Sequence, residues 1–444
     1  MRDIKAMLPE EIAAALAEMG QPKYRAKQIF QWLARGVTSF DEMTNLSKDL
    51  RAALSERFFI SKLEMLRKQV SAIDGTIKYL WQLGDGNAVE TVVMHYKHGN
   101  TVCISSQVGC RQGCAFCAST IGGLIRNLEP SEMLDEVLYS ERESGSKISN
   151  IVLMGIGEPL DNFDNVMRFL ALVNHPDGEN IGMRHISLST CGLIERFDDL
   201  AARDLQLTLS VSLHAPDDAT RSKIMPANHG RGVAALIDAC ARYYEATGRR
   251  ISFEYAMIDG VNDTPEHARL LAKHARRVCA HVNLIPLNHV EERAFRPRGF
   301  FPVIRIRRFI QRQRVRDVSF IGAHNEYSPE FKPLQAMQRR ASDAGRVRVI
   351  RNVSRNLQRL DAALRERALI IVKQTVRSGS DDDRGEREVA FRIDQVMDLT
   401  DDPAHFVREF LSDIEFGERS VAEGDLALLI LIGFLPFVQD VVRG

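Results

Sequence analysis

Between residues 101 and 290 the sequence alternates six times between a short apolar segment and a longer amphipathic one. The apolar segments are nearly continuous in hydrophobic residues, which is typical of parallel strands buried on both faces. Six β-α units in series predict an α/β fold whose parallel sheet curls into a partial or full barrel. The expected strands are 101–108, 150–156, 185–191, 207–214, 251–258 and 281–288. The expected helices are 130–143, 164–174, 193–203, 233–246 and 264–278.

Polar residues gather at the C-terminal ends of these strands, the edge where barrel enzymes place their reactive groups. They are Gly157 and Glu158 after the second strand, Ser189 on the third, Ser212 to His214 ending the fourth and Asn288 ending the sixth. No single residue is specific, and His214 is equally typical of a buried core histidine. Their shared edge predicts a site.

Four of the seven cysteines lie within residues 103–117, and Cys110, Cys114 and Cys117 form a C-x3-C-x2-C motif. A zinc site usually shows paired C-x2-C units with a fourth cysteine or histidine nearby, which this segment lacks. Three thiolates can instead bind three irons of a [4Fe-4S] cluster and leave the fourth iron open to a small molecule. Phe116, just before the third cysteine, could shield such a cluster. The alternative is three buried cysteines without a ligand.

Residues 1–90 predict a mostly helical region followed by a strand-rich stretch, with amphipathic helices over 8–20 and 24–36 that each end at a glycine. The second helix mixes cationic and aromatic side chains, which suits contact with RNA phosphates and bases. The alternative is a solvated helix face with a buried aromatic stripe. The residues concerned are Lys23, Tyr24, Arg25, Lys27, Phe30 and Trp32.

The region after residue 290 carries weaker signals. Nine arginines and no acidic residue lie between Arg293 and Arg316, which predicts either an RNA-facing segment or an incidental Arg-rich stretch. A strand is expected over 317–324, a helix over 357–376, a polar linker over 378–388 and a buried apolar helix over 426–438.

Composition adds exclusions. Lys+Arg 59 balance Asp+Glu 59, so net charge favours no partner, and a 45% hydrophobic content excludes a collagenous or disordered chain. The N-terminus lacks the apolar core of a secretory signal, and the longest apolar run, 426–435, is half of the roughly 20 residues that a membrane span needs. These features predict a cytoplasmic protein without a membrane segment.

The cysteine motif followed by Gly-Glu-Pro resembles the radical S-adenosylmethionine (SAM) enzymes. Longer strings, among them AKQIFQWL, SSQVGC, MGIGEPLDN and VSLHAPDDATRSKIMP, resemble the RlmN/Cfr methyltransferases of ribosomal RNA over residues 20–290. The resemblance implies an α/β fold with a radical-SAM partial (β/α)6 barrel over 91–292. It also implies an N-terminal helical accessory domain that binds RNA over 1–90, and leaves residues 293–444 as a region of unassigned role.

The resemblance also implies site residues. Cys110, Cys114 and Cys117 would ligate the [4Fe-4S] cluster, Glu90 would accept a proton, and Cys103 would release a covalent RNA intermediate by forming a disulfide. The SAM site would comprise Gly157, Glu158, Ser189, Ser212, Leu213, His214 and Asn288. The implied reaction is methylation of C2 of an adenosine in 23S rRNA, with tRNA as a second candidate substrate. An electron donor such as flavodoxin and a monomeric state are expected.

One departure from the family pattern keeps alternatives open. The family carries its methyl group on a cysteine shortly after the barrel, whereas this chain has no cysteine after Cys279, and the match ends near Ala294. Cys191 is the only other cysteine near the expected site, and its place on a strand does not suit a mobile carrier. The alternatives are therefore a chain that binds cluster and SAM but transfers poorly or not at all, and a radical-SAM enzyme with another substrate.

Overall fold

The computed structural model forms two compact units, Met1–Asn325 and Glu326–Gly444, which we describe separately. The structure describes residues 1–288, 290, 292–297, 300–313, 315 and 318–320 of the first unit. In the second unit it describes the strands 369–377, 384–392 and 430–431.

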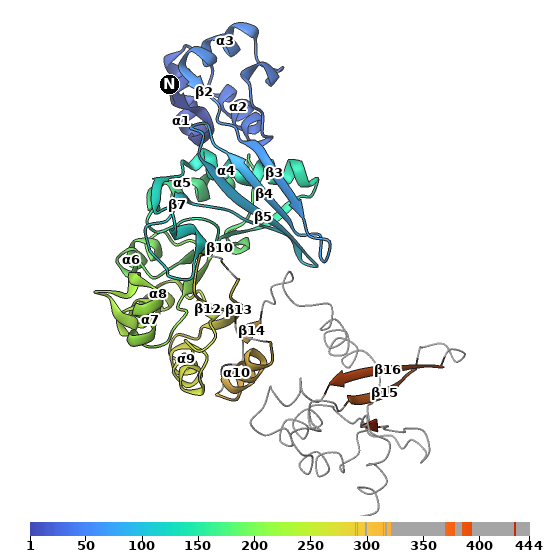
Figure 1. Ribbon diagram of the computed structural model, residues 1–444. Coiled ribbons are helices and arrows are strands. Elements are labelled where there is room, and N and C mark those ends of the chain that lie inside the picture. The colour runs from blue at the N-terminus through green and yellow to red at the C-terminus, as the bar shows by residue number, and fades with distance from the viewer. Residues whose placement is uncertain are drawn as a thin grey trace, which may run out of the picture. The chain divides into compact units, whose positions relative to one another are not determined.

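The first unit is built on one ten-stranded sheet with the order β14-β13-β12-β11-β10-β9-β6-β5-β4-β3 (Figure 1). Strands β6 to β14 run parallel, and β3 to β6 pair antiparallel. Because β3 and β14 end the order without pairing to each other, the sheet is a partial barrel. The parallel strands are β6 (Gly99–Cys103), β9 (Ile148–Leu153), β10 (Ile186–Thr190), β11 (Thr208–Ser212), β12 (Ser252–Met257), β13 (His281–Pro286) and β14 (Val318–Phe320). The antiparallel ones are β3 (Glu64–Val70), β4 (Ile77–Gln82) and β5 (Ala88–Tyr96).

All six strands expected from the sequence are present, and β14 confirms the strand expected near residue 318. The first expected strand is wrong in its extent, since β6 ends at Cys103. The residues that follow form a separate antiparallel hairpin of β7 (Gln107–Gly109) and β8 (Leu124–Asn127), which encloses the cysteine motif. The apolar run over 101–108 did not reveal this break because both pieces are largely buried.

The expected helices are confirmed, with one much shorter than its pattern. They are α4 (Pro130–Ser144), α5 (Phe163–Val173), α6 (Phe197–Ala201), α8 (Gly232–Thr247) and α9 (Pro265–Arg277). Helix α7 (Asp218–Ile224) was not expected from the sequence pattern, and its first turn is capped by Asp217 Oδ1, which accepts from Thr220 N at 2.8 Å. The arginine-rich segment contains helix α10 (Phe300–Arg312).

The N-terminal helices α1 (Pro9–Glu18), α2 (Tyr24–Ala34) and α3 (Lys48–Arg57) confirm the helical start of the chain. A buried ion pair ties this region to α4. Lys5 Nζ donates to Asp135 Oδ1 at 2.6 Å and to the Ser61 carbonyl at 2.7 Å, and both charged side chains are fully shielded from solvent. The Ser61 hydroxyl donates to the other carboxylate oxygen at 2.8 Å, so the charges are paired and hydrogen-bonded.

We expect Lys5→Met to destabilise the protein by about 3–5 kcal/mol, because it leaves the Asp135 carboxylate buried without its cation. Chemical denaturation measures the loss. The double variant Lys5→Met/Asp135→Leu removes both charges and should recover part of it, and Arg196→Met, which breaks an exposed pair with Asp199, should cost no more than about 1 kcal/mol. A Lys5→Met protein as stable as the wild type contradicts this role.

In the second unit, β15 (Leu369–Arg377) pairs antiparallel with β16 (Arg384–Arg392) and with β17 (Ile430–Leu431). The helix expected over 357–376 is therefore wrong from residue 369 onward, because the β-branched run Ile-Ile-Val followed by Thr-Val favours a strand. The linker expected over 378–388 is wrong from residue 384, and residues 430–431 of the expected apolar helix form a strand. The remaining parts of these three expectations lie outside the described residues.

Candidate active site

The cysteine motif lies in a loop between β7 and β8 whose two ends touch. Cys110 N donates to the Gly123 carbonyl at 2.9 Å. Gly109 has φ +74°, and a Cβ at this position would lie 1.9 Å from that same carbonyl oxygen. Only glycine can both adopt this conformation and allow the backbones to approach so closely.

Hydrogen bonds to backbone carbonyl groups hold the loop in place. The Thr120 hydroxyl lies 3.1 Å from the Cys114 carbonyl and 3.0 Å from the Cys117 carbonyl. Ala115 N donates to the carbonyl of Ile224 at the end of α7, at 2.8 Å. All three thiols are free of disulfides. The loop is thus ordered without a disulfide, and its three sulfur atoms stay available as ligands.

The thiols are close enough to influence one another electrostatically. Burial raises the pKa of Cys110 to about 11 and that of Cys114 to about 12, and the neighbouring thiols and the Glu158 carboxylate act in the same direction. Such thiols lose their protons when a metal binds. Among the described residues no three-ligand group suits a single metal ion.

The Gly-Glu-Pro loop after β9 lies beside this hairpin. Gly157 has φ +108°, and a Cβ there would lie 2.8 Å from Gln107 N. Glu158 is buried, and its carboxylate accepts from Cys191 N at 2.7 Å and from Leu160 N at 3.0 Å. Burial raises the pKa of this carboxyl group. Glu158 therefore ties the loop after β9 to the end of β10.

The ends of β10 and β11 bring further expected residues together. Ser189 Oγ lies 3.5 Å from Ser212 Oγ. Leu213 is fully buried, and its N–H donates to the Glu254 carbonyl at 3.1 Å. Asn288 lies two residues beyond β13 and is exposed to solvent. The residues expected to bind SAM thus share the carboxyl edge of the parallel strands, as the sequence predicted.

His214 is buried and has a left-handed backbone conformation with φ +52°. Its Nδ1 accepts from Ala256 N at 3.0 Å, and its ring meets Phe116 edge-on at 5.1 Å between centroids. Burial lowers the pKa of His214 to about 3, so the imidazole is neutral and keeps its proton on Nε2. His214 is thus a buried core histidine with one ring nitrogen, Nδ1, in a hydrogen bond. Its ring packs against Phe116, which precedes the third cysteine of the motif.

Glu90 and Cys103 lie on adjacent strands. Val92 of β5 pairs with Cys103 of β6, and Glu90 is two residues from Val92, so Glu90 and Cys103 face the same side of the sheet. Diagonal neighbours of this kind are about 7–8 Å apart. The Glu90 carboxylate pairs with Lys78 Nζ at 2.8 Å, and 42% of its side chain is exposed. Burial raises the pKa of the Cys103 thiol to about 12.

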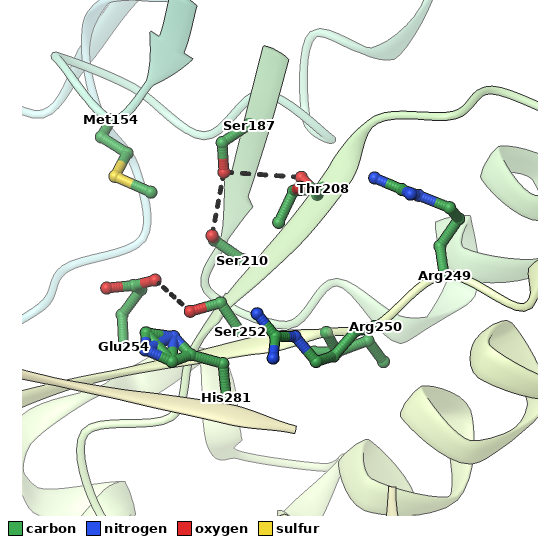
Figure 2. Close-up of a pocket in the computed structure, with 10 residues that line it drawn as sticks. Met154, Ser187, Thr208, Ser210, Arg249, Arg250, Ser252, Glu254 and His281 are labelled. Atoms are coloured by element: carbon green, nitrogen blue, oxygen red, sulfur yellow. Dashed lines mark hydrogen bonds between the residues drawn. The ribbon is translucent and has the colours of Figure 1, made fainter. Parts of the chain in front are cut away.

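Below the carboxyl edge, the inner face of the barrel holds a polar cavity of about 370 Å³ (Figure 2). Ser187 and Ser210 line it, each two residues before an expected SAM-binding serine on the same strand. Their hydroxyls lie 3.0 Å apart. A polar inner face could have been expected from the sequence, because serines alternate with apolar residues at 187–189 and 210–212. Also lining it are Met154, Thr208, Arg249, Arg250, Ile251, Ser252, Glu254 and His281.

The cationic and aromatic residues of α2 divide between the surface and the core. Tyr24 is 60% exposed, and the Arg25 guanidinium lies 5.1 Å from its ring centroid. Trp32 is half-buried and donates from Nε1 to Asn45 at 2.7 Å. Phe30 is buried, however, and Lys27 pairs with Asp177 at 2.6 Å. The helix thus has the solvated face and part of the buried aromatic stripe of the second alternative, and its contact with RNA stays a prediction.

Two arginines of the arginine-rich segment contact the protein itself. Arg293 Nη2 donates to the Cys117 carbonyl at 3.0 Å and to Thr120 Oγ1 at 2.8 Å, and Arg307 Nε donates to the Val318 carbonyl at 3.2 Å. Contact of this segment with RNA stays a prediction. Arg298, Arg314 and Arg316 lie outside the described residues.

The partial barrel with a three-cysteine loop at its carboxyl edge defines a radical SAM enzyme, and residues 104–271 match the family model of the Radical SAM superfamily. Such an enzyme uses a [4Fe-4S] cluster and SAM. Residues 3–60 match the model described as the ribosomal RNA large subunit methyltransferase N-terminal domain. In the described part of the chain, no helix is long and apolar enough to cross a membrane.

Known proteins narrow the class further. A probable dual-specificity RNA methyltransferase RlmN from Desulforamulus reducens is 53% identical over 294 residues, which are 66% of this chain and 84% of the relative. Its counterpart from Lachnoclostridium phytofermentans is 51% identical over 295 residues, or 66% and 83% of the two chains. A radical SAM methyltransferase from Sphaerobacter thermophilus superposes with a TM-score of 0.69 at 40% identity, covering 72% of this chain and 95% of that one. The chain belongs to the RlmN family of RNA methyltransferases.

Proposed function

We propose that this chain methylates C2 of an adenosine in 23S rRNA, with tRNA as a second substrate. The single observation that carries the proposal is the meeting of the cysteine loop, the Gly-Glu-Pro loop and the serine-bearing strand ends at one edge of a barrel. The names of the relatives, which describe dual-specificity RNA methyltransferases, support RNA as the substrate. The choice of C2 rests on overall likeness to the RlmN sequences.

In this proposal Cys110, Cys114 and Cys117 hold the cluster, which with SAM supplies the radical chemistry that methylation of an aromatic carbon needs. The loop of Gly157 and Glu158 forms one wall of the SAM site. The opposite wall comes from Ser189, Ser212, Leu213, His214 and Asn288. The two oxygens of the Glu158 carboxylate accept hydrogen bonds from the backbone N–H groups of Leu160 and Cys191, which fixes the loop, and each oxygen has a second acceptor site.

Glu90 and Cys103 are the proposed catalytic pair. Glu90, exposed and on the same face as Cys103, can accept the adenosine ring proton through its free carboxylate oxygen. Lys78 Nζ pairs with the other carboxylate oxygen at 2.8 Å and so helps to orient the group. Cys103 would then release the RNA by attacking, as a thiolate, the sulfur of the cysteine that carries the methyl-derived carbon: a disulfide forms, the sulfur–carbon bond breaks, and the carbon on the adenosine takes up a proton. Because the chain has no cysteine after Cys279, this step needs a carrier among its other thiols. Because burial raises the pKa of the Cys103 thiol, a base must remove its proton before it attacks.

The experiment that tests the proposal incubates the reconstituted chain with SAM, a reductant and RNA, and measures 5′-deoxyadenosine and methyladenosine. Both products are expected, and omission of RNA should abolish the methyladenosine alone. SAM cleavage without methyladenosine favours the alternative of a chain that binds both cofactors but has lost transfer, which the absence of a cysteine after Cys279 motivates. Methylation of a non-RNA substrate favours the third alternative.

We also propose that residues 1–90 bind the RNA through the face of α2 that carries the exposed Tyr24 and the half-buried Arg25. The double variant Tyr24→Ala/Arg25→Ala should weaken RNA binding about tenfold, because it removes one stacking ring and one phosphate contact. Filter binding at several salt concentrations measures the affinity and should show a flatter salt dependence. Arg57→Ala, on α3, serves as a charge-matched control. Unchanged affinity and salt slope in the double variant would exclude this face.

A further inference from the structure

Arg221 on α7 is a buried arginine whose bonds converge on the proposed SAM site. Only 1% of it is exposed. Its Nε donates to the Leu213 carbonyl at 3.0 Å, and its Nη2 donates to the Cys191 carbonyl at 2.6 Å and lies 3.2 Å from the Ser212 carbonyl. Its Nη1 donates to Asn228 Oδ1 at 2.8 Å.

These bonds join the ends of two strands. The Cys191 carbonyl follows β10, and the carbonyls of Ser212 and Leu213 end β11. Ser212 and Leu213 are proposed SAM contacts, and the Cys191 amide is the group that fixes Glu158. A single planar guanidinium therefore sets the spacing of the strand ends that form one wall of the site. The five fixed donors of arginine suit this task, whereas an ammonium cannot bridge the same carbonyls.

The charge of Arg221 has no direct carboxylate partner among its hydrogen bonds. All its bonded acceptors are neutral oxygens, and the Asp218 carboxylate reaches it only through Asn228, which donates to Asp218 Oδ1 at 2.9 Å. Buried charges are normally compensated by an anion. The arrangement thus leaves room for a second source of negative charge near the guanidinium.

The cysteine loop lies against the same helix. Ala115 N donates to the Ile224 carbonyl one turn after Arg221, and Gly113 lies against Pro226. The helix that carries this buried cation therefore packs against the loop that would hold an anionic, thiolate-ligated cluster.

We propose that Arg221 is a positioning residue with two separable tasks. The hydrogen bonds of its planar guanidinium fix the strand ends that receive SAM, and its positive charge stabilises the cluster held by Cys114. The inference rests on the proposed assignment of Cys110, Cys114 and Cys117 as ligands. Two variants separate the tasks. Arg221→Met removes both the charge and the hydrogen bonds of the guanidinium. Arg221→Lys keeps a positive charge but loses the planar array of donors.

The cluster potential is measured by redox titration followed by electron paramagnetic resonance, and SAM affinity by equilibrium dialysis. Reduction adds negative charge, which a nearby cation favours, so Arg221→Met should lower the midpoint potential and Arg221→Lys should leave it near the wild-type value. Both variants should bind SAM about tenfold more weakly, since each loses hydrogen bonds from a charged donor. Arg242→Met, which removes an exposed cation on α8, should change neither quantity.

Thermal unfolding of the cluster-free proteins separates these effects from a general loss of structure. If Arg221→Met does not fold, the SAM affinity of Arg221→Lys decides the question. A wild-type cluster potential in Arg221→Met would contradict the role of the charge. A wild-type SAM affinity in Arg221→Lys would contradict the role of the guanidinium hydrogen bonds. Failure of the wild-type protein to take up iron would instead contradict the ligand assignment under the proposed function, so the two failures are distinguishable.

Discussion

Cys114→Ala, reconstituted anaerobically with iron and sulfide, is expected to lack the broad visible absorbance of a [4Fe-4S] cluster. Cys114 is the central ligand of the loop, and removing one of three thiolates leaves two, which cannot hold three irons of the cluster. SAM cleavage should fall at least about 100-fold, because activity requires the intact metal site. Iron analysis and SAM turnover measure the two losses.

Cys240→Ala is the matched control for this variant. Cys240 is fully buried on α8, as a core cysteine with no role in the loop, and its replacement leaves the motif intact. It should bind iron as the wild type does. Visible absorbance and iron content that survive in Cys114→Ala would exclude the proposed ligand set.

Gly157→Ala should weaken SAM binding by about 10–100-fold, since a left-handed conformation and close contacts both oppose the new side chain. The added Cβ would lie 2.6 Å from Gln107 Cβ and 2.8 Å from Gln107 N. The loop must shift, and with it Glu158 and the wall of the SAM site. Equilibrium dialysis with SAM measures the effect.

Gly86→Ala tests whether crowding or conformation is responsible. Gly86, in the turn between β4 and β5, has φ +86° but no atom within 4 Å of an added Cβ. It shares the backbone strain without the close contact. Gly86→Ala should lower stability slightly and leave SAM affinity unchanged. Equal SAM affinity in Gly157→Ala and the wild type would show that the loop does not form the site.

The parallel strands and their shared edge could be predicted because each strand is a continuous apolar run, and parallel strands present their carboxyl ends on one side. Local sequence does not show which distant groups fill the space between those ends. Arg221 illustrates the limit, since its charge and its place in a short polar helix suggest a solvated residue. Only the fold reveals that it is buried against the carbonyls of β10 and β11.

Glu158 shows a second limit. The resemblance predicts that Glu158 belongs to the SAM site, but it does not predict the two backbone N–H groups that its oxygens accept. Such partners lie 2 and 33 residues away in sequence and leave no periodic pattern. The strand β15 shows a third limit. In the sequence its β-branched residues directly follow a helical pattern, with no glycine or proline between them. The sequence pattern therefore does not show that the expected helix has to end before residue 369.

The central claim, that this chain is a radical SAM methyltransferase of RNA adenosine, is tested most directly by mass spectrometry of nucleosides from RNA treated with the reconstituted full chain and SAM. The account predicts 2-methyladenosine in 23S rRNA, dependent on the cluster and absent with Cys114→Ala. RNA without any methyladenosine, in a reaction where SAM is nonetheless cleaved to 5′-deoxyadenosine, would contradict it.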